Sequence, residues 1–207
     1  MSDSTRRAYW LKTLHRWHWI SSALCLIGMI IFAATGITLN HAASIESAPQ
    51  VQSLVAQLPD AMLDQIQSDG GAAPRKAPLP ATLRAWLKHE LSVEAGSRDA
   101  EWSEDEIYLS LPRPGGDAWL AVDLASGEVE YELTTRGWVS YLNDLHKGRN
   151  TGVVWRWFID IFAAACLVFS LTGLFLLKMH AGGRFATWPV VGLGVLIPAL
   201  LALLFIH

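Results

Sequence analysis

Three long apolar runs dominate the pattern of hydrophobic and polar positions along the chain. Ile20–Leu39 and Phe185–Ile206 contain no charged residue, and Val153–Leu177 contains two near its start. Each run holds about 20 residues or more, enough for a helix to cross a hydrocarbon core of roughly 30 Å. A buried core helix is the weaker alternative at this length. We therefore predict transmembrane helices over residues 19–41, 150–178 and 186–206.

Residues 42–149 lie between the first two predicted spans and have the composition of a water-soluble domain. Apolar residues recur at helical spacing over Val51–Gln67 and Ala81–Leu91, and Gly70–Pro80 between them has the composition of a linker. Apolar and polar residues then alternate over 106–111, 118–123 and 128–133, which is typical of an antiparallel meander. The predicted fold class is a membrane α-helical protein with three transmembrane helices and a small α+β domain inserted between the first and second spans.

Basic residues set the expected orientation of these spans. Arg6, Arg7, Lys12 and Arg16 precede the first span, and Lys178 and Arg184 flank the short connection between the second and third. The positive-inside rule places residues 1–18 and 179–185 in the cytoplasm, so residues 42–149 face the periplasm. The expected location is the bacterial inner (cytoplasmic) membrane, which the chain crosses several times.

A cleaved signal peptide is the alternative interpretation of the N-terminus. Arg6 and Arg7 precede an apolar run, and the small residues Ala42 to Ser44 follow it. The run is longer than a typical signal core and tryptophans crowd its entrance, so we expect the first span to be retained.

Charge and cysteine content narrow the classes of function. The formal net charge of −3 gives no electrostatic support for nucleic-acid binding. Cys25 and Cys166 both fall inside predicted spans and indicate neither a disulfide framework nor a metal site. A Gly-rich dinucleotide fingerprint is missing from the sequence, so we expect no flavin or nicotinamide site in this chain.

Histidines carry the candidate chemistry. They stand at the ends of the first two predicted spans: His15, His18, His41, His146 and His180. Neutral imidazole is a good axial ligand for haem iron, and ionisable residues at spans are usually functional. We expect one or two b-type haems, held by His15 with His180 inside and by His41 with His146 outside. Helical geometry favours His15 over His18, because 26 residues bring His15 to within about 80° of the direction of His41.

Two other interpretations of these histidines stay open. Imidazoles at a membrane surface can simply contact lipid headgroups. A histidine-ligated zinc or copper site is a second alternative, although the sequence supplies no matching cysteine or carboxylate partners.

Four segments resemble one known family. They are Leu14–Trp17 (LHRW), Thr35–His41 (TGITLNH), Leu145–Arg149 (LHKGR) and Leu171–Leu177 (LTGLFLL). In this order and spacing they resemble the PepSY-associated transmembrane helix family, and the helix and meander between them look like a PepSY domain. Some members are haem-containing inner-membrane reductases that take iron from siderophores by reducing it. His15, His41 and His146 match the span-edge histidines of the family, whereas the role of His180 follows from placement alone.

The resemblance implies an electron-transfer protein. Electrons would pass from a quinol or a partner protein on the cytoplasmic side to a periplasmic acceptor such as ferric-siderophore iron. Larger members have four or more spans, so this shorter chain suits a homodimer or a subunit of a larger complex in the lipid bilayer. The alternative function is a non-haem PepSY membrane anchor or regulatory subunit that binds a periplasmic protein partner.

Overall fold

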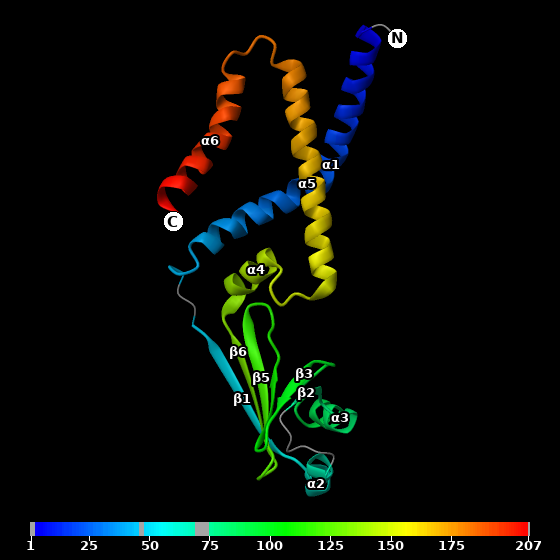
Figure 1. Cartoon of the computed structure of the whole chain (residues 1–207), viewed down its shortest axis with the longest axis vertical. Helices are drawn as coiled ribbons and strands as arrows, with labels where there is room; N and C mark the ends of the chain where they lie inside the picture. The colour runs from blue at the N-terminus through cyan, green and yellow to red at the C-terminus, as the bar shows by residue number, and fades with distance from the viewer. Residues whose placement is uncertain (1–2, 46–47, 69–74, 207) are drawn as a thin grey trace. The chain divides into compact units, whose positions relative to one another are not determined.

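The computed structural model describes residues 3–45, 48–68 and 75–206 (Figure 1). The chain forms two compact units, which are residues 1–31 with 158–207, and residues 32–157. In chain order the elements are α1 (Asp3–Asn40), β1 (Gln50–Gln57), α2 (Asp60–Ser68), β2 (Arg75–Pro78), α3 (Ala81–Glu90), β3 (Asp99–Trp102), β4 (Glu106–Ser110), β5 (Gly116–Asp123), β6 (Glu128–Thr135), α4 (Gly137–Lys147), α5 (Gly152–His180) and α6 (Thr187–Phe205).

The first unit consists of α6 and of most of α1 and α5. Over the described residues, three helices are long and apolar enough to cross a membrane: Thr5–Asn40, Gly152–His180 and Thr187–Phe205. Their most apolar windows are 17%, 6% and 0% buried inside the protein, so nearly all of this apolar surface needs lipid or another apolar partner. Within the unit α1 approaches α5 closely at Gly28, where a Cβ atom would lie 2.3 Å from Phe162.

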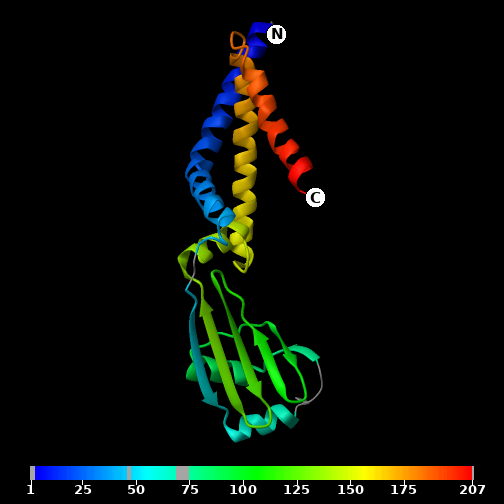
Figure 2. The same cartoon turned by 90° about the vertical axis from the view of Figure 1, so that its left-hand side faces the viewer.

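The second unit is built on an antiparallel sheet. Its six described strands have the order β1-β6-β5-β4-β3-β2, and Figure 2 shows them side by side. The register pairs Ile107 with Val122 and Leu109 with Leu120, which places these side chains on one face. Alternate residues along β5 are buried, as expected for a sheet covered on one side.

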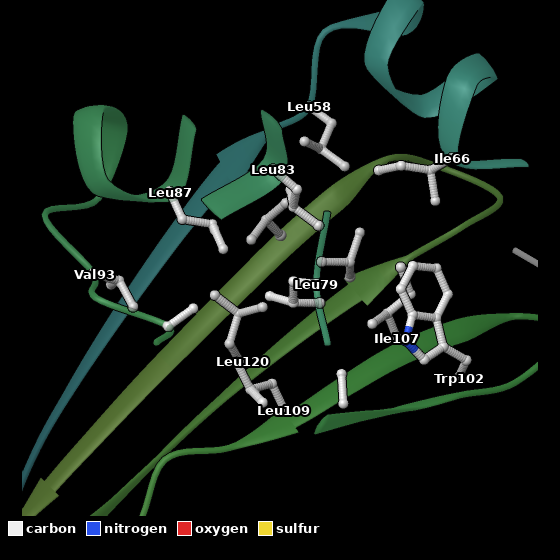
Figure 3. Close-up of a cluster of buried hydrophobic side chains, with 14 of the residues drawn as sticks. Leu58, Ile66, Leu79, Leu83, Leu87, Val93, Trp102, Ile107, Leu109 and Leu120 are labelled. Carbon is white, nitrogen blue, oxygen red and sulfur yellow. The ribbon is translucent and has the colours of Figure 1, made fainter. Parts of the chain in front are cut away.

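Two helices cover that face of the sheet. Leu83 and Leu87 of α3, together with Ile66 of α2, pack into one cluster with Leu109 and Leu120 (Figure 3). Leu83, Leu87, Leu109 and Leu120 are fully buried. Each such leucine stabilises the fold by about 1.5–3 kcal/mol relative to an exposed position, before entropy is counted. The fold of this unit therefore depends on one apolar cluster between the sheet and its helices.

The helix predicted over Val51–Gln67 is wrong. Residues 50–57 form β1, which pairs with β6 along its whole length, and the helix α2 begins only at Asp60. Pro59 separates the two elements, because proline has no N–H to continue a ladder and restricts the residue before it. The N–H of Leu58 instead donates to the carbonyl of Gly127 at 2.9 Å.

Other parts of the soluble domain were only partly predicted. The helix over Ala81–Leu91 and the strands near 106–111, 118–123 and 128–133 are confirmed by α3, β4, β5 and β6. The predicted linker contains the strand β2 at its end, while residues 70–74 of that linker lie outside the described residues. The helix α4, which carries His146, was not predicted at all.

Candidate functional site

The candidate histidines fall into two groups that follow the two units. His15 and His18 of α1 share the first unit with His180, the last residue of α5. His41, directly after α1, shares the second unit with His146 in the last turn of α4. Each set of histidines is described by itself below.

His15 and His180 face each other across two helices. Their ring centroids are 5.7 Å apart and the ring planes are nearly perpendicular, at 89°. Nδ1 of His15 lies 2.8 Å from the carbonyl oxygen of Leu11, and Nδ1 of His180 lies 2.8 Å from that of Leu176. Both side chains are exposed, and each ring contacts the carbonyl four residues earlier in its own helix as well as the other ring.

His18 is half-buried and contacts α5 rather than its own helix. Its Nδ1 lies 3.1 Å from both the carbonyl oxygen of Phe169 and the hydroxyl of Thr172. The ring stacks on Phe169 with centroids 4.6 Å apart and an interplanar angle of 15°. Cε1 of His18 comes within 3.2 Å of where a Cβ atom on Gly173 would lie. The side chain is therefore fixed on three sides by α5.

His146 has a similar environment in the other unit. Its Nδ1 lies 2.7 Å from the hydroxyl of Thr35, and its ring lies 4.9 Å from that of Phe32. Cε1 of His146 is 3.6 Å from where a Cβ atom on Gly36 would lie. His41 follows one turn later, where its Nδ1 lies 3.0 Å from the carbonyl oxygen of Ile37 and its side chain is exposed.

The position of His146 depends on how α4 is anchored. Thr38 donates a hydrogen bond to the side chain of Asn143 at 2.8 Å, and the backbone N–H of Gly115 donates to Asp144 at 2.8 Å. Asn143 and Asp144 are both buried, although their residue types are usually exposed. The helix ends at Gly148, which has the left-handed conformation typical of a helix C-terminus. These contacts fix α4, and with it His146, between the end of α1 and the sheet.

Comparison with known families identifies the chain. Residues 9–207 match the family model described as putative PepSY_TM-like. The chain belongs to this family. Comparisons with curated proteins and with solved structures find no match for this PepSY_TM-like chain. The match confirms the resemblance to PepSY-associated transmembrane proteins, and with the three apolar helices it shows a multi-pass membrane protein with an inserted sheet domain.

The hydrogen bonds decide which imidazole nitrogen of this PepSY_TM-like protein is available. A carbonyl oxygen only accepts hydrogen bonds, so Nδ1 of His15, His18, His41 and His180 must carry the proton. Nε2 is then the nitrogen with the lone pair. Metal-bound histidines have this arrangement, since the second ring N–H donates to an oxygen and orients the ligand.

Zinc and haem differ in the protein ligands that they require. Over the described residues, histidine, cysteine and carboxylate side chains form no group of three or more that is placed to hold a metal ion. Structural and catalytic zinc sites use three or four protein ligands, whereas b-type haem needs only imidazoles above and below the iron. A pair of imidazoles on two helices, such as His15 and His180, is the kind of donor set that haem iron takes.

The threonine and aromatic partners of the histidines were not predicted from the sequence. Thr172 is 154 residues from His18, and Thr35 is 111 residues from His146. The dipeptide Thr-Gly occurs at both places, inside segments that the family resemblance had already singled out. That repeated Thr-Gly dipeptide was the sequence signal from which these partners could have been predicted.

Proposed function

We propose that this PepSY_TM-like protein is a b-type haem protein of the bacterial inner membrane that carries electrons across the membrane. One haem would use His180 with a histidine of α1, either His15 or His18. The other would use His146 with His41. The observation that carries the proposal is that Nδ1 of these rings is held by a helix oxygen, which leaves Nε2 available as an iron ligand.

The chain's own residues would bind, orient and tune the cofactor. Haem b supplies a one-electron ferric–ferrous couple when it is bound. The imidazoles would hold the iron in a low-spin state, and the helix oxygens would fix the direction of each ring. The apolar helices would lower the local dielectric around the site.

The proposal also covers the electron donor and the electron acceptor of the protein. Because the sequence offers no nucleotide fingerprint, a membrane quinol or a partner protein is the proposed donor. We assign the soluble domain to the periplasm on the basis of the basic residues before α1, which places the acceptor there too. Ferric-siderophore iron is the proposed acceptor, which would make the protein a reductase or an electron-transfer subunit.

An absorption spectrum of the full chain tests the proposal. The protein would be expressed with added haem, purified in detergent, and measured as isolated and after dithionite. Low-spin haem with two imidazoles should give a Soret band and a sharp α band on reduction. A wild-type protein without Soret absorbance would overturn the proposal and leave a PepSY membrane anchor for a periplasmic partner.

His146→Ala is the first variant to compare. If two haems are present, it should remove about half of the reduced α-band intensity, since the sites in the other unit keep their ligands. His89→Ala is the control, because His89 is exposed on α3 and contacts only the neighbouring carboxylate of Glu90, at 2.8 Å. An unchanged spectrum for His146→Ala would remove this residue from the ligand set.

A further inference from the structure

Two Thr-Gly dipeptides hold two histidines in the same way. Thr172 and Thr35 are both buried, each 8% exposed, and each is followed by glycine. Each threonine oxygen lies within hydrogen-bond distance of the Nδ1 atom of a histidine on another helix. We infer that Thr172–Gly173 and Thr35–Gly36 are positioning residues that present Nε2 of His18 and His146 to haem, and that His18 rather than His15 is the haem ligand from α1. The inference rests on the proposed function.

The carbonyl of Phe169 fixes Nδ1 of His18 as a hydrogen-bond donor, and proton counting on the threonines supports the same direction at His146. A threonine hydroxyl has one proton and accepts with its remaining lone pairs. The hydroxyl of Thr172 donates to the carbonyl of Val168 at 2.7 Å, and that of Thr35 donates to Phe32 at 3.2 Å. Each oxygen therefore accepts from the imidazole N–H. In this arrangement Thr172 together with the carbonyl of Phe169, and Thr35 at the other site, hold the rings in the Nδ1–H tautomer, which leaves Nε2 for iron.

The glycines allow each imidazole to approach the helix. A Cβ atom at position 173 would lie 3.2 Å from Cε1 of His18, which is tighter than an ordinary van der Waals contact. Glycine in a helix interior costs about 1 kcal/mol relative to alanine in water. Small residues are nevertheless common where another group must come close to a helix backbone. Both glycines stand directly beneath an imidazole, which explains their positions.

Three other histidines have a different environment in the part of the chain that the structure describes. His15, His41 and His180 are exposed, and Nδ1 of each bonds the carbonyl four residues earlier. That contact is available to a histidine in many helices and requires no second element. His18 and His146 are half-buried and are oriented by another helix. Of the two α1 candidates, only His18 shares the environment of His146.

Removal of the threonine hydroxyl should weaken haem binding and alter its chemistry. Substitution of the group that orients a metal-ligating histidine typically lowers metal affinity by about 10- to 100-fold. Loss of the acceptor also makes the imidazole less basic, which stabilises ferric haem less and raises the midpoint potential. A residue that only supports packing would not shift the potential in this direction.

The experiment compares Thr172→Val and Thr35→Val with Thr172→Ser and Thr35→Ser in the full chain. Valine keeps the shape and loses the hydroxyl, whereas serine keeps the hydroxyl. Thr82→Val is the control, since Thr82 is an exposed helical threonine on α3. We expect both valine variants to lose haem and to raise the potential of what remains, and both serine variants to resemble the wild type.

Two further measurements separate the possible failures. His18→Ala should abolish the first haem while His15→Ala retains it, and the reverse result would overturn the choice of His18. Nitrogen-15 NMR of histidine-labelled protein without haem reports the tautomers directly. It should show protonated Nδ1 for His18 and His146. The His146 signal should be lost in Thr35→Val, whereas the carbonyl of Phe169 should keep the His18 signal in Thr172→Val.

A wild-type protein that binds no haem contradicts the proposed function. A haem-loaded wild type whose Thr172→Val and Thr35→Val variants bind haem and titrate like Thr82→Val contradicts only this inference.

Discussion

Gly115 lies at the tip of the hairpin that supports α4, and its replacement should displace His146. Its φ is +73°, and a Cβ atom would lie 2.7 Å from Cα of Tyr141 and 2.9 Å from its backbone nitrogen. A residue other than glycine with left-handed geometry costs about 1–2 kcal/mol. Overpacking against a backbone that cannot move aside costs about 1–3 kcal/mol more. Gly115→Ala should therefore lower the free energy of unfolding of this unit by about 2–5 kcal/mol.

Gly96→Ala provides the matched control for this prediction. Gly96 has a similar φ of +63°, but no atom lies within 4 Å of its Cβ position, so only the backbone term of about 1–2 kcal/mol applies. Hydrogen-exchange mass spectrometry of the full chain in detergent resolves peptides of β5 and β6 from the apolar helices. Equal loss of protection in the two variants would refute the steric contribution of Tyr141. Unchanged haem content in Gly115→Ala would refute the link from this hairpin to His146.

Three further predictions follow from single residues. Gly173→Ala should reduce haem content more than Gly36→Ala. The new Cβ atom would lie 3.2 Å from Cε1 of His18 in the first variant and 3.6 Å from Cε1 of His146 in the second. The intensity of the reduced α band measures the haem content. Hydrogen bonds from the backbone N–H and hydroxyl of Ser126 hold the pKa of the Asp123 carboxyl below its usual range. The ionised Asp123 carboxylate therefore stabilises the fold above about pH 4, and this stabilisation is lost as the pH falls through the lowered pKa. Thermal unfolding from about pH 7 to about pH 3 should show that acid destabilises the wild type more than Asp123→Asn. A reporter that is active only in the cytoplasm, fused after His207, should stay silent, and strong activity there would exclude three spans with a cytoplasmic N-terminus.

The apolar helices and the strands β4 to β6 could be predicted from the sequence, whereas the edge strand β1 could not. The apolar runs were recognisable because a bilayer demands about 20 apolar residues in succession. The strands β4 to β6 were recognisable because one buried face imposes strict alternation. The edge strand β1 is exposed along nearly its whole length, so its apolar residues need not alternate. Val51, Leu54 and Val55 then matched a helical repeat by chance.

The grouping of the histidines could be predicted, but their partners could not. Runs of apolar residues place His15 and His18 near one end of α1 and His41 near the other, whatever the packing. The contacts of His18 with Thr172 and of His146 with Thr35 depend on how separate helices pack and rotate. Helix rotation is set by side-chain packing, for which the sequence alone gave only the approximate angle that favoured His15.

The choice of threonine as the partner of each histidine has a physical rationale. A carboxylate would orient the imidazole as well, but an ionised carboxylate among apolar helices is costly. A threonine hydroxyl satisfies its own proton on the preceding turn of its helix and offers a neutral acceptor. A neutral acceptor makes the imidazole less basic than a carboxylate would, and a less basic ligand favours the ferrous state. If the proposed haems are present, Thr35→Asp should therefore lower the midpoint potential of the His146 site, the opposite of the shift expected for Thr35→Val.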